Sequence, residues 1–531
     1  MKKQLQILSL ILFSSCITNA QITFQKTYDG EGDEWGTLIC STTNGGYFVT
    51  GSTTSLGSGD WNVYVIKLDL HGDVIWSETI NVLQSEYEVG EVARQTSDGG
   101  YILLGRSYVC LPGSNGDDIL LVKLDSSGDV EWSHCYGYAS HSEGSMDVFL
   151  SSDGGYVITA YSYLPGTGAD VHIIKTDSNG TVIWSKVYGG TKDDIPYSLT
   201  ETANGGFVFC GWTYSFDSFY FEQKDIWLTK IDENGELIWS KKYGYGLEWA
   251  QSFLQTTDGG FIIAGGGTNS STAGEDDIFV LRTDSDGNVL WAKTYGDTSC
   301  DEAWGIAYTG DGYIISGEKG CYPANDYNMY LVKISDGGEL LWAKTFGSNQ
   351  ADRGGRVLYS TDGGFLLSGY RYGYDSTMSD LYLIKTDSYG NSGCYENDVI
   401  LTVDSPAVIV ISVVPAVSSG SNTESDPDLS IGSGAAETTL CLATGINKTV
   451  INSDSILIFP NPSSGEVTIS LSKNHFTQIM ISDLLGKAVR QFSSPYFQKE
   501  MTISLADLAK GIYFLQLISD EGIPVRKIIK E

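Results

Sequence analysis

The sequence DVHIIKTDSNGTVIWSKVYGG, residues 170–190, consists of two apolar runs joined by a polar turn, and it recurs along the chain. Its back half returns as VIWSETI, VEWSHCYGY, LIWSKKYGY, VLWAKTYGD and LLWAKTFGS, each time after a front half that ends in a cation, an Asp and a Gly. QITFQKTYDGEGDEW (21–35) is a back half without a front half, and DLYLIKTDSYGN (380–391) is a front half without a back half. The two fragments complete one repeat, so we expect them to meet in space.

The full repeat is marked by an Asn or Asp, two glycines and an aromatic residue. Seven such aromatics follow one another at intervals of 51 to 55 residues: Tyr47, Tyr101, Tyr156, Phe207, Phe261, Tyr313 and Phe365. Each interval holds four short apolar runs bounded by turn residues. A period near fifty with four strands is typical of a propeller blade.

Two kinds of turn favour strands over helices. The Asn-Gly and Asp-Gly pairs before each repeat aromatic are hairpin dipeptides, because both residues tolerate positive φ. A second turn has Asp first and Gly fourth, as in Asp177 to Gly180, which suits a type I turn. We therefore predict an all-β fold, a seven-bladed β-propeller over residues 21–395 that the N-terminal strand closes.

The strand that carries the repeat tryptophan is predicted to be the innermost strand of each blade. In the seventh blade, Phe24 would take the place of the tryptophan that the other six blades supply: Trp76, Trp132, Trp184, Trp239, Trp291 and Trp342. Closing the ring in this way removes the exposed edges of an open sheet.

Charge and the N-terminal segment limit the environment of the protein. The 531 residues include 32 Lys and Arg against 66 Asp and Glu, for a net charge of −34, which repels nucleic acid and attracts cations. Lys2 and Lys3, the apolar run to Ile17 and the small Ala20 predict a signal peptide over 1–20. The alternative makes Cys16 a lipoprotein acceptor. After signal removal, the sequence predicts no transmembrane segment.

Acidic residues recur thirteen positions before the repeat aromatics, or eleven in the sixth repeat. We expect them after the innermost strand, as a ring at one mouth of the central channel: Glu34, Glu88, Glu143, Asp194, Glu248, Glu302 and Asp352. One hypothesis is a site for a metal, with Ca²⁺ as the candidate, or for a polyol. The other is that each carboxylate accepts backbone N–H groups at a blade junction.

A second repeated set is interpreted as scaffold, because an active site would break the symmetry of the repeat. It comprises a polar residue placed at the start of the outermost strand and a cation five residues later. The polar residues are Asn62, Asp118, Asp170, Asp225, Asp277, Asn328 and Asp380, and the cations are Lys67, Lys123, Lys175, Lys230, Arg282, Lys333 and Lys385.

The sequence offers no catalytic set and therefore predicts no enzyme. No nucleophile motif, phosphate-binding loop, metal-spaced histidine set or clear acid/base pair is present. Additional aromatics in the repeats could stack on sugar rings or simply pack in the core: Trp61, Trp212, Trp227 and Trp249.

The repeat ends near Cys394. Residues 396–452 are predicted to be a partly flexible linker with short strands, since VILTV and VIVISVV precede a stretch rich in Ser, Gly and Thr. Eight cysteines follow the signal, an even number that permits disulfides. The candidate pairs are Cys394 with Cys441 and Cys300 with Cys321.

Residues 453–531 alternate in hydrophobicity and predict a small β-sandwich. They carry Pro460, Asn461, Pro462 and Gly465, then Gly486 and Lys487, and finally Gly511, Tyr513 and Lys527, in that order. This set of motifs closely resembles the type A C-terminal sorting domain of the type IX secretion system. Residues 21–395 more loosely resemble the secreted bacterial β-propeller repeat proteins that carry such tails.

The resemblance implies a bacterium of the Bacteroidetes group, the type IX secretion machinery as partner, and release outside the cell or anchoring on the outer membrane. For the propeller we expect a non-catalytic binding module for glycan or protein. The alternatives are a propeller hydrolase or lyase that acts on polysaccharide, and a structural surface component.

Overall fold

The structure is a computed structural model, and it divides into two compact units, residues 1–442 and 443–531. It describes residues 21–530 except 31, 56–60, 83–86, 109, 112, 115, 139, 204, 217–223, 245, 269–275, 321–326, 348–350, 373–377, 420–422, 426–428, 434–435, 445–455, 460–465, 472–477, 483–487, 494–499, 507 and 519–524. The expected signal peptide lies outside the described residues. Within them, no helix is long and apolar enough to cross a membrane.

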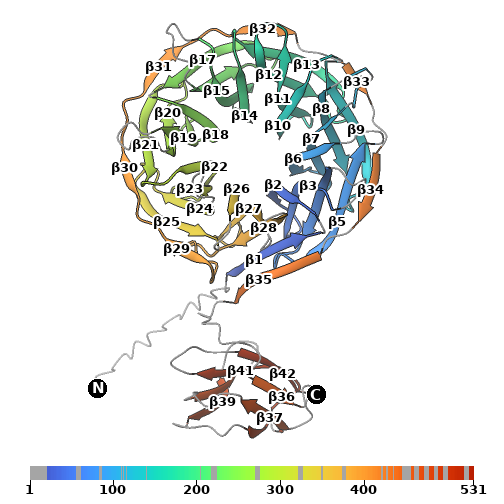
Figure 1. Cartoon of the computed structure of the whole chain (residues 1–531), viewed down its shortest axis with the longest axis vertical. Coiled ribbons are helices and arrows are strands. Elements are labelled where there is room, and N and C mark those ends of the chain that lie inside the picture. Colours follow the sequence, from blue (N-terminus) through green and yellow to red (C-terminus); the bar gives the residue numbers. More distant parts are fainter. Residues whose placement is uncertain are drawn as a thin grey trace, which may run out of the picture. The chain divides into compact units, whose positions relative to one another are not determined.

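The first unit is a ring of seven antiparallel sheets, each of which contains five strands (Figure 1). The predicted seven-bladed propeller is therefore confirmed. In every blade, four strands come from the repeat and the fifth comes from a later part of the chain. The apolar runs of the repeat fill the clusters between neighbouring blades, which explains why the second and third strands are buried along most of their length.

The blades follow one plan from the centre outwards. The innermost strands are β2 (Glu34–Ser41), β6 (Glu88–Gln95), β10 (Glu143–Leu150), β14 (Asp194–Glu201), β18 (Glu248–Gln255), β22 (Asp301–Tyr308) and β26 (Asp352–Tyr359). The second strands are β3 (Tyr47–Thr53), β7 (Tyr101–Tyr108), β11 (Tyr156–Leu164), β15 (Phe207–Thr213), β19 (Phe261–Thr268), β23 (Tyr313–Lys319) and β27 (Phe365–Tyr372).

The next two strands carry the repeated front and back halves. The third strands are β4 (Asn62–Leu68), β8 (Asp117–Leu124), β12 (Gly168–Thr176), β16 (Asp225–Ile231), β20 (Asp276–Thr283), β24 (Asn328–Ile334) and β28 (Ser379–Lys385). The fourth strands are β5 (Val74–Val82), β9 (Val130–Gly137), β13 (Val182–Gly189), β17 (Leu237–Gly244), β21 (Val289–Gly296), β25 (Leu340–Phe346) and β1 (Ile22–Asp29).

The predicted order of the strands from the channel outwards is wrong. The strand that carries the repeat tryptophan is the fourth from the centre, and the strand after the acidic residue is the innermost. The set that begins with Asn62 lies accordingly on the third strands, not on the outermost ones. The sequence alone leaves the direction open, because hairpin signals define the order of strands in a blade but not which end faces the axis.

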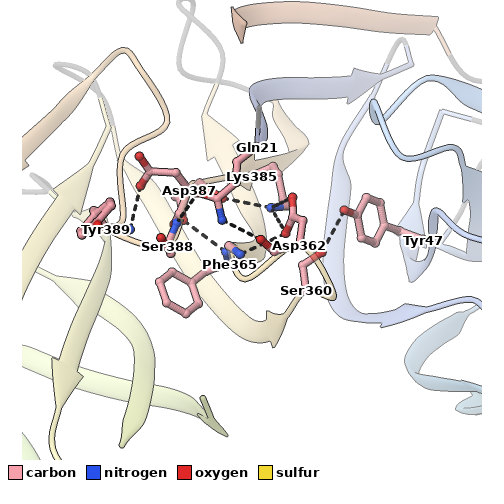
Figure 2. A network of polar contacts seen from close by, with 11 residues as sticks. Gln21, Tyr47, Ser360, Asp362, Phe365, Lys385, Asp387, Ser388 and Tyr389 are labelled. Carbon is pink, nitrogen blue, oxygen red and sulfur yellow. Dashed lines mark hydrogen bonds and ion pairs between the residues drawn. The ribbon is translucent and has the colours of Figure 1, made fainter. Parts of the chain in front are cut away.

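The N-terminal strand closes the ring as predicted. Strand β1 pairs with β28, and Phe24 stands opposite Lys385, in the register that places Trp76 opposite Lys67 in the first blade. Gln21 secures the junction at its edge, since its side chain donates to the Asp362 carbonyl at 2.7 Å and accepts from the Ser388 amide at 3.0 Å (Figure 2). Phe24 is therefore the equivalent of the tryptophans.

Neighbouring blades are joined through these aromatic rings. Each ring lies against the glycine of the Asp-x-x-Gly turn in the next blade, where a Cβ at Gly72 would come within 2.7 Å of the Phe24 ring. These glycines also have positive φ, 75° at Gly72 and 86° at Gly180, so a side chain there would be strained as well as crowded. In five blades a tyrosine hydroxyl donates to the same glycine carbonyl, as Tyr188 does to Gly235 at 2.6 Å.

The repeated cations and polar residues of the third strands hold the blades internally. Lys175 is buried and reaches the Asp153 carboxylate of its own Gly-Gly hairpin at 2.8 Å, and Lys123, Arg282, Lys333 and Lys385 do the same in their blades. The Asp170 carboxylate lies where a Cβ of Gly189 would stand, 1.8 Å from it, which explains the glycine at the end of the Tyr-Gly motif. These contacts support the scaffold interpretation.

Residues 396–444 form a strap that runs once around the ring, and this differs from the expected linker. Its strands add one after another to the outer edges of the blades, in the direction opposite to the chain order of the blades (Figure 1). They are β29 (Glu396–Asp398), β30 (Thr402–Asp404), β31 (Ile409–Ser412), β32 (Ala416–Ser419), β33 (Thr423–Ser425), β34 (Leu429–Ser433) and β35 (Ala436–Thr444).

The strap is attached by hydrogen bonds and by single apolar anchors. Val399 and Val413 donate backbone hydrogen bonds to Ala343 and Ser240 at 2.9 and 3.0 Å. Leu401 and Val413 are buried in the clusters between blades, whereas Ile400 and Val414 point outwards. The fourth strand of each blade, which would otherwise be an exposed edge, thus pairs with a strand of the strap. The composition of this Ser- and Gly-rich segment alone does not predict such pairing.

The second unit contains two antiparallel sheets. One holds β36 (Ile456–Phe459), β37 (Glu466–Leu471) and β40 (Glu500–Ser504), and the other holds β38 (Gln478–Ser482), β39 (Ala488–Ser493), β41 (Gly511–Ile518) and β42 (Val525–Lys530). Side chains from both sheets form one buried cluster that includes Val467, Ile479 and Leu515. The sandwich remains a prediction.

One disulfide was missed by the sequence analysis. Cys110 and Cys135 are bonded within the second blade, with their Cα atoms 6.1 Å apart. Cys300 and Cys394 each take part in a further disulfide, while Cys40 and Cys210 are free thiols. Cys321 and the side chain of Cys441 lie outside what the structure describes, so the pairs Cys300–Cys321 and Cys394–Cys441 remain predictions.

The ring-closing aromatic gives a first test. Phe24→Ala removes a fully buried ring from the junction of the seventh and first blades, and we expect a loss of about 3–5 kcal/mol in the free energy of unfolding, measured by urea denaturation. Ile183→Ala, at a side chain 58% exposed, is the control and should change stability by less than about 0.5 kcal/mol. Equal effects of the two variants would contradict the role assigned to Phe24.

The cysteines give a second test. The mature chain, unfolded without reductant, should label at two thiols, Cys40 and Cys210. Peptide mapping should recover Cys110 linked to Cys135, and we expect Cys394 linked to Cys441, which would join the two ends of the strap. A third labelled thiol, or Cys394 linked elsewhere, would disprove this pattern.

Candidate functional site

The predicted acidic ring lies where the chain passes from one blade to the next. Its members are the first residues of the innermost strands, and each is at most 1% exposed. In the sixth blade this place belongs to Asp301 and not to Glu302, which is the following residue on β22. In the sixth repeat the acidic residue that begins the innermost strand lies twelve positions before the aromatic Tyr313, and not eleven as predicted.

The ring carboxylates accept hydrogen bonds both from the connection that precedes their blade and from side chains of their own blade. Glu34 accepts hydrogen bonds from the Gly30 amide at 3.0 Å and the Thr53 hydroxyl at 2.8 Å. Asp194 accepts from the Gly190 amide at 2.7 Å, and from the hydroxyls of Ser215 at 2.9 Å and Thr213. Such bonds close the turn between blades, as the hydrogen-bonding alternative predicted.

The geometry does not support a shared metal site in this ring. Among the described residues, which include all seven predicted members, no group of three or more acidic, Cys or His side chains is placed to hold a metal ion. Burial even raises the pKa of Glu143 to about 9, although the Tyr138 amide donates to it at 3.2 Å. A carboxyl group that keeps its proton at neutral pH is a poor cation ligand.

The four candidate tryptophans have different surroundings. Trp227 is fully buried and donates to the Ser240 hydroxyl at 2.7 Å, so it is a core residue. Lys224 lies over the rings of Trp212 and Trp249, at 4.6 and 5.6 Å from the ring centres. Trp61 contacts Trp35, with ring centres 4.4 Å apart.

A bulge in every innermost strand creates a different set of side chains, one that breaks the symmetry of the repeat. The register of each innermost strand shifts around its fourth residue. An extra residue at a bulge leaves the ladder and is turned to a new direction. The residues at this position are of seven different types: Thr37, Glu91, Met146, Tyr197, Gln251, Trp304 and Gly355.

Six of these seven residues line one cavity of about 240 Å³, together with residues from the neighbouring layers. The lining comes from all seven blades, so the cavity lies in the central channel. Polar contributions come from Glu91, Gln251, Glu318, Arg353 and Arg356, and aromatic ones from Tyr197, Trp304 and Tyr370. The turn, aromatic and cation motifs of the blade repeat, whereas the bulge residues that line the channel do not.

Ion pairs neutralise several charges in and around the channel. Arg106 lies 3.6 Å from Glu91, and Arg353 lies 3.4 Å from Glu318, measured between nitrogen and oxygen. Behind the lining, Arg94 contacts Asp147 at 2.8 Å. Desolvation nevertheless raises the pKa of Glu318 to about 7, and it also raises the pKa of Glu91.

The sequence held a signal for this site that the analysis missed. Aligning the seven innermost strands column by column shows that the fourth column holds a different residue type in every blade. Polar residues that recur in every blade are instead typical of the blade junctions, where the predicted acidic ring lies. The bulge explains why this column leaves the ladder, and neighbouring positions such as Leu38, Val92 and Arg356 line the channel as well.

Known proteins resemble the two units to different degrees. Residues 457–531 match the family described as a secretion system C-terminal sorting domain. Together, fold and tail define the class: the chain is a cargo of the type IX secretion system that carries a β-propeller, and it is exported to the cell surface or the extracellular space. The sorting domain also implies an interaction with the type IX machinery.

The predicted sorting residues are partly visible. Tyr513 is buried and donates to the Ala509 carbonyl at 2.8 Å, Gly511 begins β41, and Lys527 lies in β42 opposite Phe514. Pro460, Asn461, Pro462, Gly465, Gly486 and Lys487 lie outside the described residues.

Solved structures resemble the whole chain only weakly. A glucose dehydrogenase crystal structure is 10% identical and covers 58% of this chain and 100% of its own, with a TM-score of 0.36. Drosophila Plexin A in complex with Semaphorin 1b is 9% identical, covers 69% of this chain and 87% of its own, and has a TM-score of 0.39. Such scores carry no argument about function. No curated protein matches the chain.

The protonated Glu143 predicts an unusual dependence of stability on pH. Because the folded carboxyl binds its proton more tightly than the unfolded one, the free energy of unfolding falls as pH rises from about 4.5 to about 9. Glu143→Gln should remove this loss and raise the urea midpoint at pH 8, with little change at pH 4.

Asp194→Asn is the matched comparison for Glu143→Gln. Its new amide would direct a donor at the donors that surround Asp194, and we expect a loss of about 1–3 kcal/mol at pH 7. If Glu143→Gln lowers stability equally at pH 4 and pH 8, its carboxylate is charged and stabilising in the folded protein.

Proposed function

We propose that the propeller is a non-catalytic binding module of an exported protein and that it binds a glycan or protein ligand in its central channel. One observation carries the proposal: the residues that break the seven-fold repeat gather around one cavity. A scaffold alone would gain from repetition at these positions too, since equivalent blades pack equivalently. Side chains that differ in every blade suit the recognition of an asymmetric ligand.

Export supports this proposal. A protein delivered outside the cell meets polysaccharides and other surface proteins, and the anionic character of the whole chain, at −34, keeps it apart from nucleic acid. Anchoring on the outer membrane of a Bacteroidetes-type bacterium, after removal of a signal peptide, belongs to the same proposal.

The second candidate function is a hydrolase or lyase that acts on polysaccharide, and Glu318 favours it. Its pKa of about 7 would suit a general acid at neutral pH, and it lines the cavity. It is also paired with Arg353, which suits a binding role equally. Release of reducing ends from a polysaccharide, lost in Glu318→Gln, would establish the enzyme and contradict the binding module.

The binding module is tested with the mature full chain on a glycan array and on a panel of cell-surface proteins. We expect a ligand whose affinity falls at least tenfold in Trp304→Ala and in Tyr197→Ala, because both remove lining from the cavity. Tyr389→Ala, at an exposed aromatic outside the channel (72% exposed), should bind as the parent protein does. Binding that is unaffected by the channel variants, or no ligand at all, would favour a structural surface component.

A further inference from the structure

We infer that the channel ligand carries a carboxylate on a sugar ring, an acidic monosaccharide unit, and that Arg356 binds this carboxylate. The inference rests on the proposed function and names its ligand. It follows from the cation, the donor, the paired acids and the aromatic side chains that share the cavity.

Arg356 forms no ion pair within 4 Å with any carboxylate of the described residues. The acids on which it acts electrostatically, Asp147 and Glu91, are already paired with other arginines. Every other arginine that lines the cavity or lies behind it, namely Arg94, Arg106 and Arg353, takes part in an ion pair within 4 Å. For Arg356 the ion pairs of the described residues include none, and its one recorded hydrogen bond reaches the Gln251 carbonyl at 3.4 Å. Burial lowers the pKa of Arg356, and the attraction of Asp147 offsets this only in part.

The sequence around Arg356 makes room for it. Strand β26 has Gly355 at a position where every other blade has a larger residue, and the neighbouring blade has Gly305, whose Cβ would come within 3.2 Å of the Arg356 Cα. Without these side chains, Arg356 extends from the seventh blade to the fifth, where it meets Gln251. No other innermost strand carries an arginine at this position.

Trp304 adds a second donor. Its indole Nε1 is buried and has no hydrogen-bond partner among the described residues, although the residue lines the same cavity. A buried N–H without an acceptor is costly, at roughly 1–3 kcal/mol, and a ligand oxygen would satisfy it. A planar guanidinium group and an N–H together suit an oxyanion, which offers several acceptor lone pairs.

The acids of the channel do not oppose a carboxylate ligand as strongly as their number suggests. Glu91 faces Arg106 and Glu318 faces Arg353. Glu302, next to Arg353 on the neighbouring strand, has a raised pKa because it is desolvated. Arg356 is thus the charge that a ligand would neutralise.

Aromatic side chains point to a sugar as the bearer of the carboxylate. Tyr370 lines the cavity and stacks with Trp35, with ring centres 5.9 Å apart, and Trp35 is 39% exposed. Tyr197 and Trp304 add two more rings. Aromatic faces bind the C–H surface of sugar rings, and a cavity of about 240 Å³ accommodates one monosaccharide unit and not a folded domain.

Calorimetric titration of the mature full chain with D-glucuronate, D-glucose and acetate, at matched ionic strength, tests the inference. We expect glucuronate to bind at least tenfold more tightly than glucose or acetate. Arg356→Met should abolish the preference over glucose, and Arg356→Lys should restore part of it. Trp304→Phe, which keeps a ring and loses the N–H, should weaken glucuronate binding several-fold.

Three results would overturn the inference. Equal binding of glucose and glucuronate would show that the carboxylate is not recognised. Equal binding of acetate and glucuronate would show that the sugar ring is not recognised. Unchanged glucuronate binding in Arg356→Met would show that Arg356 does not bind the carboxylate. Thermal melts of each variant establish that it is folded. The first two results leave the binding module intact, because a channel ligand found on the array and lost in Tyr197→Ala stands independently of the charge.

Discussion

The contact between an aromatic ring and a glycine turn holds the propeller together. In each blade the ring comes from the fourth strand, and it lies on the Asp-x-x-Gly turn of the next blade, where positive φ and lack of space both require glycine. The contact must be made seven times for the ring to close. Phe24 makes it with Gly72 of the first blade, while its own strand β1 pairs with β28 from the other end of the propeller sequence.

The strap adds a second means of closing the ring, outside the contacts between blades. The strap returns around the ring and pairs with the fourth strand of each blade. The strap starts on the sixth blade, where β29 pairs with β25, and ends on the seventh, where β35 pairs with β1. Cys394, just before β29, accepts a hydrogen bond from the Gln25 side chain of β1. An exported protein benefits from such protection, because free strand edges are sites of aggregation and of proteolysis.

The repeated and the non-repeated residues of a blade have different roles. The buried cations, the acidic junction residues and the Tyr-Gly motif recur because every blade needs the same internal bonds. The bulged residues of the innermost strands escape this requirement, since they leave the ladder and face the axis. The same geometry therefore frees these positions for recognition without loss of scaffold contacts. Trp304 uses that freedom for an indole N–H that has no acceptor among the described residues, and Arg356 directly follows Gly355 in the bulge of the seventh blade.

The sequence by itself determined the number of blades, the limits of the propeller, the closing role of Phe24 and the sorting tail, because these depend on local patterns and on their period. Tertiary structure alone decided which strand faces the axis, where the strap runs and which side chains line the channel. Hairpin signals and apolar alternation are the same whichever end of a blade points inwards, and the short strands of the strap gain their pairing only from the edges of a completed ring. The acidic residues from Glu34 to Asp352 recur in the sequence as clearly as any site would, and only the structure shows that Glu34, Asp194 and Glu143 accept backbone N–H groups between blades.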